Sequence, residues 1–244
     1  MSGSGKRENL IQRLRKKPRQ IGRYIYRERK HRIPRIWSNK ELAKFSHLFR
    51  GKVINVSGWE DKDKQGKEYK HYFKNAKEYF VSNIEGQRGL SKIENEIYLN
   101  LEENLPKDLQ RQFDVVFNHT TLEHIYQMEK AFNNLCLLSR DIVILVVPFF
   151  QEQHRTRSYG DYWRFTPQGV VKSLKERGFE ILYLSVTSFK NNSIYIFAIA
   201  ARNFKKWKDK FQPIMISDGI IKNFAEDNIV CKILKKIGDL LKLP

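Results

Sequence analysis

The feature that most constrains the fold is a series of short apolar runs separated by segments of helical or polar character. Residues 142–147 form a continuous aliphatic run, which is typical of a strand buried on both faces of a parallel sheet. Alternation of such strands with helices predicts an α/β, doubly wound, three-layer architecture. The seven expected strands are Val53–Val56, Tyr79–Ile84, Ile97–Leu101, Phe113–Asn118, Ile142–Val147, Ile181–Val186 and Ser193–Ala201.

The segments that connect these strands indicate where helices lie and in which direction the strands run. Apolar residues recur at helical spacing over Thr121–Ser139, and a polar segment before Tyr79 is also expected to be helical. Pro167–Gly178 is typical of a capped helix, with Thr166 as its N-cap. Only Thr187–Asn192 joins the last two strands, so one of them must run antiparallel. The prediction is a Rossmann-like, mostly parallel seven-stranded sheet with one antiparallel strand.

Positive charge is concentrated toward the two ends of the chain. The 244 residues include 46 lysines and arginines against 27 aspartates and glutamates, a net charge of +19. Thirteen of these basic side chains lie in residues 1–36, and residues 229–241 have the pattern of a basic amphipathic helix. We therefore expect a basic arm at 1–45, a central domain at 46–203 and a C-terminal extension at 204–244. The charge favours an anionic partner: a membrane surface, a phosphorylated substrate or nucleic acid.

Cysteine usage and hydropathy limit the environment and the cofactors. Cys136 and Cys231 have no neighbouring Cys or His ligands, so we expect a reducing compartment without a disulfide framework or structural zinc. No metal site is expected elsewhere, because His119 and His124 miss the i,i+4 spacing of helical metal ligands. No apolar run approaches the roughly 20 residues that span a bilayer, and no secretory signal is visible. The expected location is cytoplasmic, with peripheral binding at the inner membrane face favoured by the basic ends.

Candidate site residues follow the ends of the predicted strands. In an open parallel sheet, ligands bind beyond the carboxyl ends of the strands, where the strand order reverses. A glycine there lets a ligand approach the backbone, and a polar side chain at the second strand end can hydrogen-bond a ribose. The candidates selected in this way are Ser57, Gly58, Asn83, Asn100, Asn118 and His119.

The order of these segments resembles that of the class I S-adenosylmethionine-dependent methyltransferases. Val53-Ile54-Asn55-Val56-Ser57-Gly58 stands where that family has its first-strand motif. Phe113–Ile125, with its Leu-Glu-His turn, is the best match, to the fourth strand and the turn after it. Asp161-Tyr162-Trp163-Arg164-Phe165-Thr166-Pro167, preceded by His154, resembles a segment of methyltransferases from bacterial surface-glycan gene clusters. The resemblance covers about residues 48–202, and the family's sheet also ends in an antiparallel strand.

The resemblance implies S-adenosyl-L-methionine as the cofactor and adds Asn55 and Glu85 to the cofactor-binding candidates. Asn55, Asn83 and Asn100 stand at or near positions where the family usually has acidic residues, and Gly58 alone remains of its glycine-rich loop. Asparagine still forms hydrogen bonds but loses the charge-assisted share of their strength. The first-strand motif is therefore degenerate, and Glu85 is an alternative ribose ligand to Asn83.

The catalytic candidates lie after the fifth strand, on the side where an acceptor would bind. His154 and Asp161 are these candidates, because histidine titrates near neutrality and suits a general base. Two structural alternatives stay open: His154 as a surface-loop histidine, and Asp161 with Arg164 as an ion pair that fixes the loop. Trp163 and Phe165 are expected in the core more than as platforms for sugar stacking.

The leading hypothesis is a methyltransferase that acts on a sugar or glycan intermediate. One alternative is a non-catalytic protein of the same fold, which the three asparagines favour. The other is an RNA methyltransferase that uses the basic arm, although the arm lacks an RNA-binding module with interleaved aromatic residues and no recognised RNA-binding signature is present. The C-terminal helix packs either on the protein itself, on a second subunit or on an anionic membrane.

Overall fold

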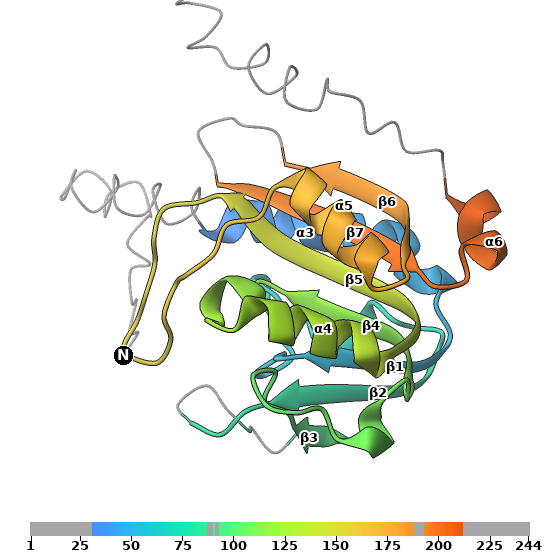
Figure 1. Cartoon of the computed structure of the whole chain (residues 1–244), viewed down its shortest axis with the longest axis horizontal. Helices are drawn as coiled ribbons and strands as arrows, with labels where there is room; N and C mark the ends of the chain where they lie inside the picture. Colours follow the sequence, from blue (N-terminus) through green and yellow to red (C-terminus); the bar gives the residue numbers. More distant parts are fainter. Residues whose placement is uncertain (1–30, 87–89, 91–92, 188–192, 212–244) are drawn as a thin grey trace, which may run out of the picture.

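A seven-stranded sheet forms the centre of the molecule (Figure 1). The computed structural model describes residues 31–86, 90, 93–187 and 193–211. The strand order is β3-β2-β1-β4-β5-β7-β6, and β7 runs antiparallel to both of its neighbours. This confirms the predicted sheet and its antiparallel strand. The strands are β1 (Gly51–Val56), β2 (Ala76–Asn83), β3 (Glu96–Tyr98), β4 (Phe113–His119), β5 (Ser139–Phe150), β6 (Glu180–Val186) and β7 (Ile194–Ala201).

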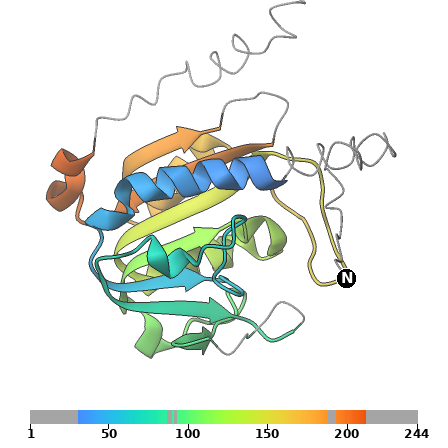
Figure 2. The same ribbon diagram turned by 180° about the vertical axis from the view of Figure 1, so that it is seen from behind.

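Helices cover both faces of the sheet and complete the three layers. Figure 1 shows α4 and α5 on one face, and Figure 2 shows α3 lying across the other. The α-helices are α3 (Ile33–Phe45), α4 (Met128–Leu138), α5 (Pro167–Glu176) and α6 (Phe204–Trp207). The 3-10 turns are η2 (Ser46–Leu48), η3 (Tyr69–His71), η4 (Lys107–Leu109), η5 (Leu122–His124) and η6 (Lys208–Lys210).

The helix expected over Thr121–Ser139 is correct only from α4 onward. Its first part is the 3-10 turn η5 followed by extended backbone. The carbonyl of Glu123 accepts hydrogen bonds from the N–H groups of Tyr162 and Trp163, at 2.7 and 3.2 Å. The Trp163 indole donates to the carbonyl of Ile125 at 2.9 Å. These carbonyls are therefore bound by a distant loop, and a continuous helix cannot use them.

The connection between β1 and β2 also differs from the expectation, because it contains no α-helix. Two aspartates organise it instead. Asp61 Oδ2 accepts from the N–H of Lys70, and Asp63 Oδ1 accepts from the N–H groups of Gln65 and Lys67, at 2.7 to 3.0 Å. Aspartate side chains that bind nearby N–H groups favour turns over helix, so the segment folds into a tight loop with the short turn η3.

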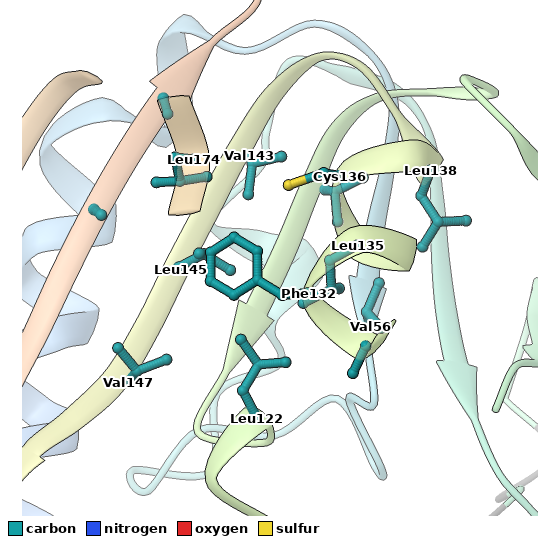
Figure 3. Close-up of a cluster of buried hydrophobic side chains, with 14 of the residues drawn as sticks. Val56, Leu122, Phe132, Leu135, Cys136, Leu138, Val143, Leu145, Val147 and Leu174 are labelled. Atoms are coloured by element: carbon teal, nitrogen blue, oxygen red, sulfur yellow. The ribbon is translucent and has the colours of Figure 1, made fainter. Parts of the chain in front are cut away.

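The larger core cluster lies between the sheet and the pair α4 and α5 (Figure 3). Phe132 and Leu135 of α4 and Leu174 of α5 are almost completely buried against β5. The expected N-cap of α5 is present, because Thr166 Oγ1 accepts from the N–H of Gly169 at 3.0 Å. Cys136 is buried here, and burial raises the pKa of its thiol to about 12. This cysteine therefore remains a protonated core residue.

The opposite face is covered by α3 and by aromatic residues of the β1–β2 connection and the C-terminal segment. Leu42 of α3 shares a buried cluster with Tyr69, Phe117 and Trp207. Residues 33–45, part of the expected arm 1–45, thus pack on the sheet. Residues 1–30 of that arm, Cys231 and the helix expected at 229–241 lie outside the described residues. Among the residues that the structure describes, no helix has the length and apolar character needed to cross a bilayer.

Candidate functional site

A cavity of about 500 Å³ opens at the carboxyl ends of β1, β2 and β4. This is the edge at which ligands bind in open parallel sheets, and its volume suits a ligand of nucleoside size. The predicted residues that line the cavity are Asn55, Ser57, Gly58, Asn83, Glu85, Asn100 and His119. Asn118 points elsewhere, since its Nδ2 donates to the carbonyl of Val56 at 2.9 Å within the core. His154 and Asp161 also lie outside the cavity lining.

The turn after β1 forms the floor of this cavity. Ser57, Trp59 and Asp61 all have positive φ angles, of 58°, 48° and 56°. Such conformations are unusual for residues other than glycine, and they concentrate at functional sites. Gly58 sits between them, and a Cβ atom there would lie 2.6 Å from Asn55 Nδ2. The glycine is therefore required by contact with the protein's own side chains.

Asn55 supports this turn from below. Its Nδ2 donates to Asp61 Oδ1 at 2.8 Å, and the same oxygen accepts from the Tyr79 hydroxyl at 2.7 Å. Burial raises the pKa of Asp61, while these hydrogen bonds oppose the shift. Sequence reasoning missed Asp61, although an acidic residue six positions after Asn55 was a visible signal.

Asn83, at the end of β2, closes the same turn. Its Oδ1 accepts from the N–H of Trp59 at 2.7 Å, and its Nδ2 donates to the carbonyl of Trp59 and to Glu96 Oε1. Both Nδ2 hydrogens are therefore used within the protein. Glu85 is an exposed residue at the rim. Asn100 caps the next turn, since its Oδ1 accepts from the N–H of Glu102 at 3.0 Å.

A closed ring of hydrogen bonds joins α3 to the end of β4. Arg35 Nη2 donates to Thr120 Oγ1 at 3.0 Å, and that hydroxyl lies 3.1 Å from His119 Nδ1. His119 Nε2 lies 2.8 Å from Ser38 Oγ, which in turn donates to the carbonyl of Arg35. Since Ser38 uses its only hydrogen there, Nε2 carries the proton and Nδ1 accepts. Burial lowers the pKa of His119 well below its usual range, so the imidazole is neutral.

Arg35 also presents a charge to the cavity. It lines the wall, and its buried Nε atom has no hydrogen-bond partner. A buried N–H donor without a partner lowers the stability of the folded protein. Such a donor on a charged guanidinium is suited to bind an anionic oxygen of a ligand. Sequence reasoning counted Arg35 as part of the basic arm, because nothing in the local pattern showed that α3 brings it to the sheet.

Beyond β5, Asp161 is held by an ion pair. Both its oxygens accept from Arg164, at 2.6 and 2.8 Å, and Oδ2 also accepts from the N–H of His154 at 2.7 Å. Burial opposes ionisation, but these hydrogen bonds and the Arg164 charge hold the pKa of Asp161 at about 2. The loop-fixing ion pair left open by the sequence is thus present. A catalytic role for either predicted residue stays a prediction.

Two further residues near the cavity were missed as site candidates. Glu123 and His124 form part of η5, and His124 lines the cavity wall. Burial raises the pKa of Glu123 to about 7 and lowers the pKa of His124 to about 4.

The expectation that both Trp163 and Phe165 belong to the core is correct for Phe165 and wrong for Trp163, which is 37% exposed. Trp163 lies at the surface because its indole donates to backbone carbonyls there.

Solved structures share this fold at low sequence identity. A SAM-dependent methyltransferase from Clostridium acetobutylicum matches with a TM-score of 0.51 and 11% identity, over 76% of this chain and 99% of that chain. The CMeT domain of the citrinin polyketide synthase matches with a TM-score of 0.52 and 12% identity, over 79% of this chain and 59% of that chain. No protein-family model and no curated protein matches the chain. These similarities establish the fold of the class I methyltransferases.

Proposed function

We propose that this protein is a methyltransferase that uses S-adenosyl-L-methionine as its cofactor. The observation that carries the proposal is the cavity at the carboxyl ends of β1, β2 and β4, in a sheet that shares its fold with a known SAM-dependent methyltransferase. When bound, the cofactor supplies an electrophilic methyl group for in-line attack by the acceptor. The protein's task is then mainly to position the two reactants.

The cavity residues fit such a cofactor at two points. Arg35, with its buried Nε lacking a partner, would bind the cofactor's carboxylate. Glu85 and Asn100 line the same cavity and would bind the ribose hydroxyls. Asn55, Ser57, Gly58 and Asn83 would instead act by holding the turn on which the cofactor rests.

We propose a sugar or glycan intermediate as the acceptor. Three exposed aromatic side chains support this: Tyr126, Tyr162 and Trp163, which are 69%, 52% and 37% exposed. The rings of Tyr126 and Tyr162 meet edge to face with centroids 5.5 Å apart. Tyr126 follows Ile125 of the cavity wall in the chain, and the Trp163 indole donates to the carbonyl of Ile125. Exposed aromatic clusters are typical of binding surfaces, and their rings offer flat apolar faces for stacking. His154, with Asp161 positioning it, would lie on this acceptor side.

The proposal extends to location in the cell. The basic ends of the chain are suited to an anionic surface, where each nearby Lys or Arg adds about 1 kcal/mol of attraction. Glycan precursors built on lipid carriers would meet a cytoplasmic enzyme at such a surface. Peripheral attachment would therefore bring the enzyme to its acceptor.

Calorimetric titration of the full chain with S-adenosylhomocysteine and S-adenosylmethionine tests the cofactor assignment. We expect saturable binding that weakens by about tenfold or more in Arg35→Gln, from loss of a charge-assisted hydrogen bond. Arg50→Gln is the matched control, since Arg50 is exposed just before β1. Thermal melting of each variant establishes that it is folded. Absence of binding at millimolar ligand would contradict the proposal.

One observation favours a second candidate, a non-catalytic protein of the same fold. The side-chain amides of Asn55 and Asn83 are used in hydrogen bonds within the protein. Charged residues at these two positions would make stronger contacts with a ligand. Nucleoside binding without formation of S-adenosylhomocysteine, measured with a glycan-lipid extract as acceptor, would favour this candidate.

A further inference from the structure

We propose that Glu123, His124 and His154 form a binding site for a divalent transition-metal cation of the zinc type. One ligand atom from each of these residues lies within 4.8 Å of the other two. Glu123 and His124 come from η5, and His154 comes from the segment that leaves β5 and returns to α5 (Figure 1). His154 is distant in the sequence from the adjacent pair Glu123 and His124, so their spacing gives no metal-binding motif.

The Glu123 carboxylate is the strongest single observation for this site. Its side chain is completely buried, and neither of its oxygens has a hydrogen-bond partner. Leaving a buried carboxylate without partners is costly unless a proton or a cation compensates it. Arg35 and Arg164 affect it electrostatically, as does Asp161. However, neither arginine donates a hydrogen bond to this carboxylate, since Arg35 Nη2 donates to Thr120 and Arg164 is engaged by Asp161. The carboxylate therefore remains available to an additional cation.

The hydrogen bonds of His124 orient it as a metal ligand. Its Nδ1 lies 2.6 Å from the carbonyl of Gly160. A carbonyl only accepts, so Nδ1 carries the proton and Nε2 keeps its lone pair. Nε2 lies 3.7 Å from Glu123 Oε1. A histidine bound to metal commonly donates its second N–H to a carbonyl in this way.

His154 completes the set from the opposite side. Its ring centroid lies 4.9 Å from that of His124, and its Nδ1 lies 3.3 Å from Asp161 Oδ2. Asp161 is fixed in turn by two hydrogen bonds from Arg164. A carboxylate next to the ring of a ligating histidine is a common outer partner in zinc sites, where it fixes the ring orientation.

The donor set selects the class of cation. Two imidazole nitrogens and one carboxylate oxygen suit zinc and its neighbours, whereas magnesium and calcium prefer oxygen ligands alone. Ligands about 2.0–2.1 Å from a tetrahedral zinc lie roughly 3.4 Å apart, so the gap of 3.7 Å between Glu123 and His124 needs little closure. Three protein ligands leave one position open. His124 borders the cavity, and the open position can therefore take a water molecule or a ligand oxygen.

The test uses the full chain after treatment with a chelator and in the absence of nucleoside, so its outcome does not depend on the proposed methyl transfer. Titration with Zn²⁺ is followed by calorimetry, and Co²⁺ is used as a probe because a site with imidazole ligands gives visible absorption. We expect one tight equivalent of Zn²⁺, a Zn²⁺-dependent rise in melting temperature, and no competition from Mg²⁺ at equal concentration.

Variants separate this site from adventitious binding. Glu123→Gln keeps the shape of the buried side chain, and His124→Ala and His154→Ala remove the nitrogens. Each should weaken Zn²⁺ binding by more than about 100-fold, beyond the loss typical of an outer partner. His71→Ala is the matched control, because His71 is exposed on η3 and lies outside the cluster. Unchanged Zn²⁺ affinity in folded Glu123→Gln and His124→Ala, an equal loss in His71→Ala, or absence of a stoichiometric site would overturn the proposal.

Discussion

At the scale of single residues, the hydrogen bonds that a polar side chain already makes within the protein decide whether it can bind a ligand. Asn83 and Thr120 are nearly buried, and both hold neighbouring backbone or side chains in place. By contrast, one buried polar atom of Arg35 and both carboxylate oxygens of Glu123 have no hydrogen-bond partner. Asn83 was a candidate in the sequence because it lies at the end of a strand. Only the hydrogen bonds in the structure distinguish a side chain that holds a turn from one that can bind a ligand.

Asn83→Asp is expected to destabilise the protein by about 1–3 kcal/mol at neutral pH. The new carboxylate oxygen would face Glu96 Oε1, to which Asn83 now donates. Two close carboxylates raise the pKa of one of them above its unfolded value. The variant therefore recovers stability as the pH falls and loses it as the pH rises. Urea denaturation at pH 5 and pH 7.5 measures this, with the exposed Asn133→Asp as control. An equal loss at both pH values would contradict the argument.

Thr120→Val tests the ring that joins α3 to β4. The substitution removes the hydroxyl that accepts from Arg35 and pairs with His119 Nδ1. It should cost about 1–3 kcal/mol, because polar groups are left without partners. Thr121→Val is the neighbouring control, since the Thr121 hydroxyl makes one long contact of 3.5 Å with the carbonyl of His119. Chemical denaturation of both variants gives the comparison, and similar losses would remove the special role of the ring.

At the scale of elements, predictability follows from where the determining contacts lie. β5 was predictable because burial on both faces requires a continuous aliphatic sequence, and α5 because its cap is local. The β1–β2 connection was not predictable, because the side chains of Asp61 and Asp63 accept hydrogen bonds from backbone N–H groups in place of the backbone carbonyls of a helix. The predicted start of the helix at Thr121 was wrong because the loop with Tyr162 and Trp163, distant in the sequence, binds the carbonyls of Glu123 and Ile125. The cavity edge was thus predictable, whereas the contribution of α3 to it was not.

Leu42→Ala tests how firmly α3 is attached to the sheet. Leu42 is 1% exposed within the cluster on that face. Its truncation should cost about 2–5 kcal/mol. It should also weaken nucleoside binding, because α3 carries Arg35 to the cavity. Lys40→Ala, on the exposed side of the same helix, should stay within about 0.5 kcal/mol of the parent protein. Thermal melting and calorimetry on the same samples provide both readouts, and a loss of stability without loss of binding would separate α3 from the site.

At the scale of the whole molecule, charge and fold have separate roles. The net charge of +19 lies largely toward the ends of the chain, whereas the central sheet and its cavity form from residues of ordinary composition. Charge of this kind acts on association with partners and does not specify a fold. The basic ends are therefore expected to influence where in the cell the protein binds, and not how it folds.

We expect the full chain to float with anionic vesicles at low salt and to remain unbound at high salt, because screening shortens electrostatic attraction. Removal of residues 1–30 together with 229–244 should abolish flotation. The N-terminal cut stops at residue 30 because α3 begins at Ile33 and belongs to the core. Neutral vesicles are the control. A full-length protein that stays at the bottom of the gradient at low salt would contradict membrane docking.

The position of α3 on the sheet has a consequence for synthesis on the ribosome. α3 precedes every strand that the structure describes, yet Leu42 shares its buried cluster with Phe197 and Ile199 of β7, the last of those strands. The Tyr183 hydroxyl of β6 also donates to Glu41 of α3 at 2.6 Å. α3 therefore waits, with its apolar residues uncovered, until these last strands emerge. Contacts so distant in sequence slow folding and expose the nascent chain to aggregation, so the yield of folded protein depends on what shields that helix during translation.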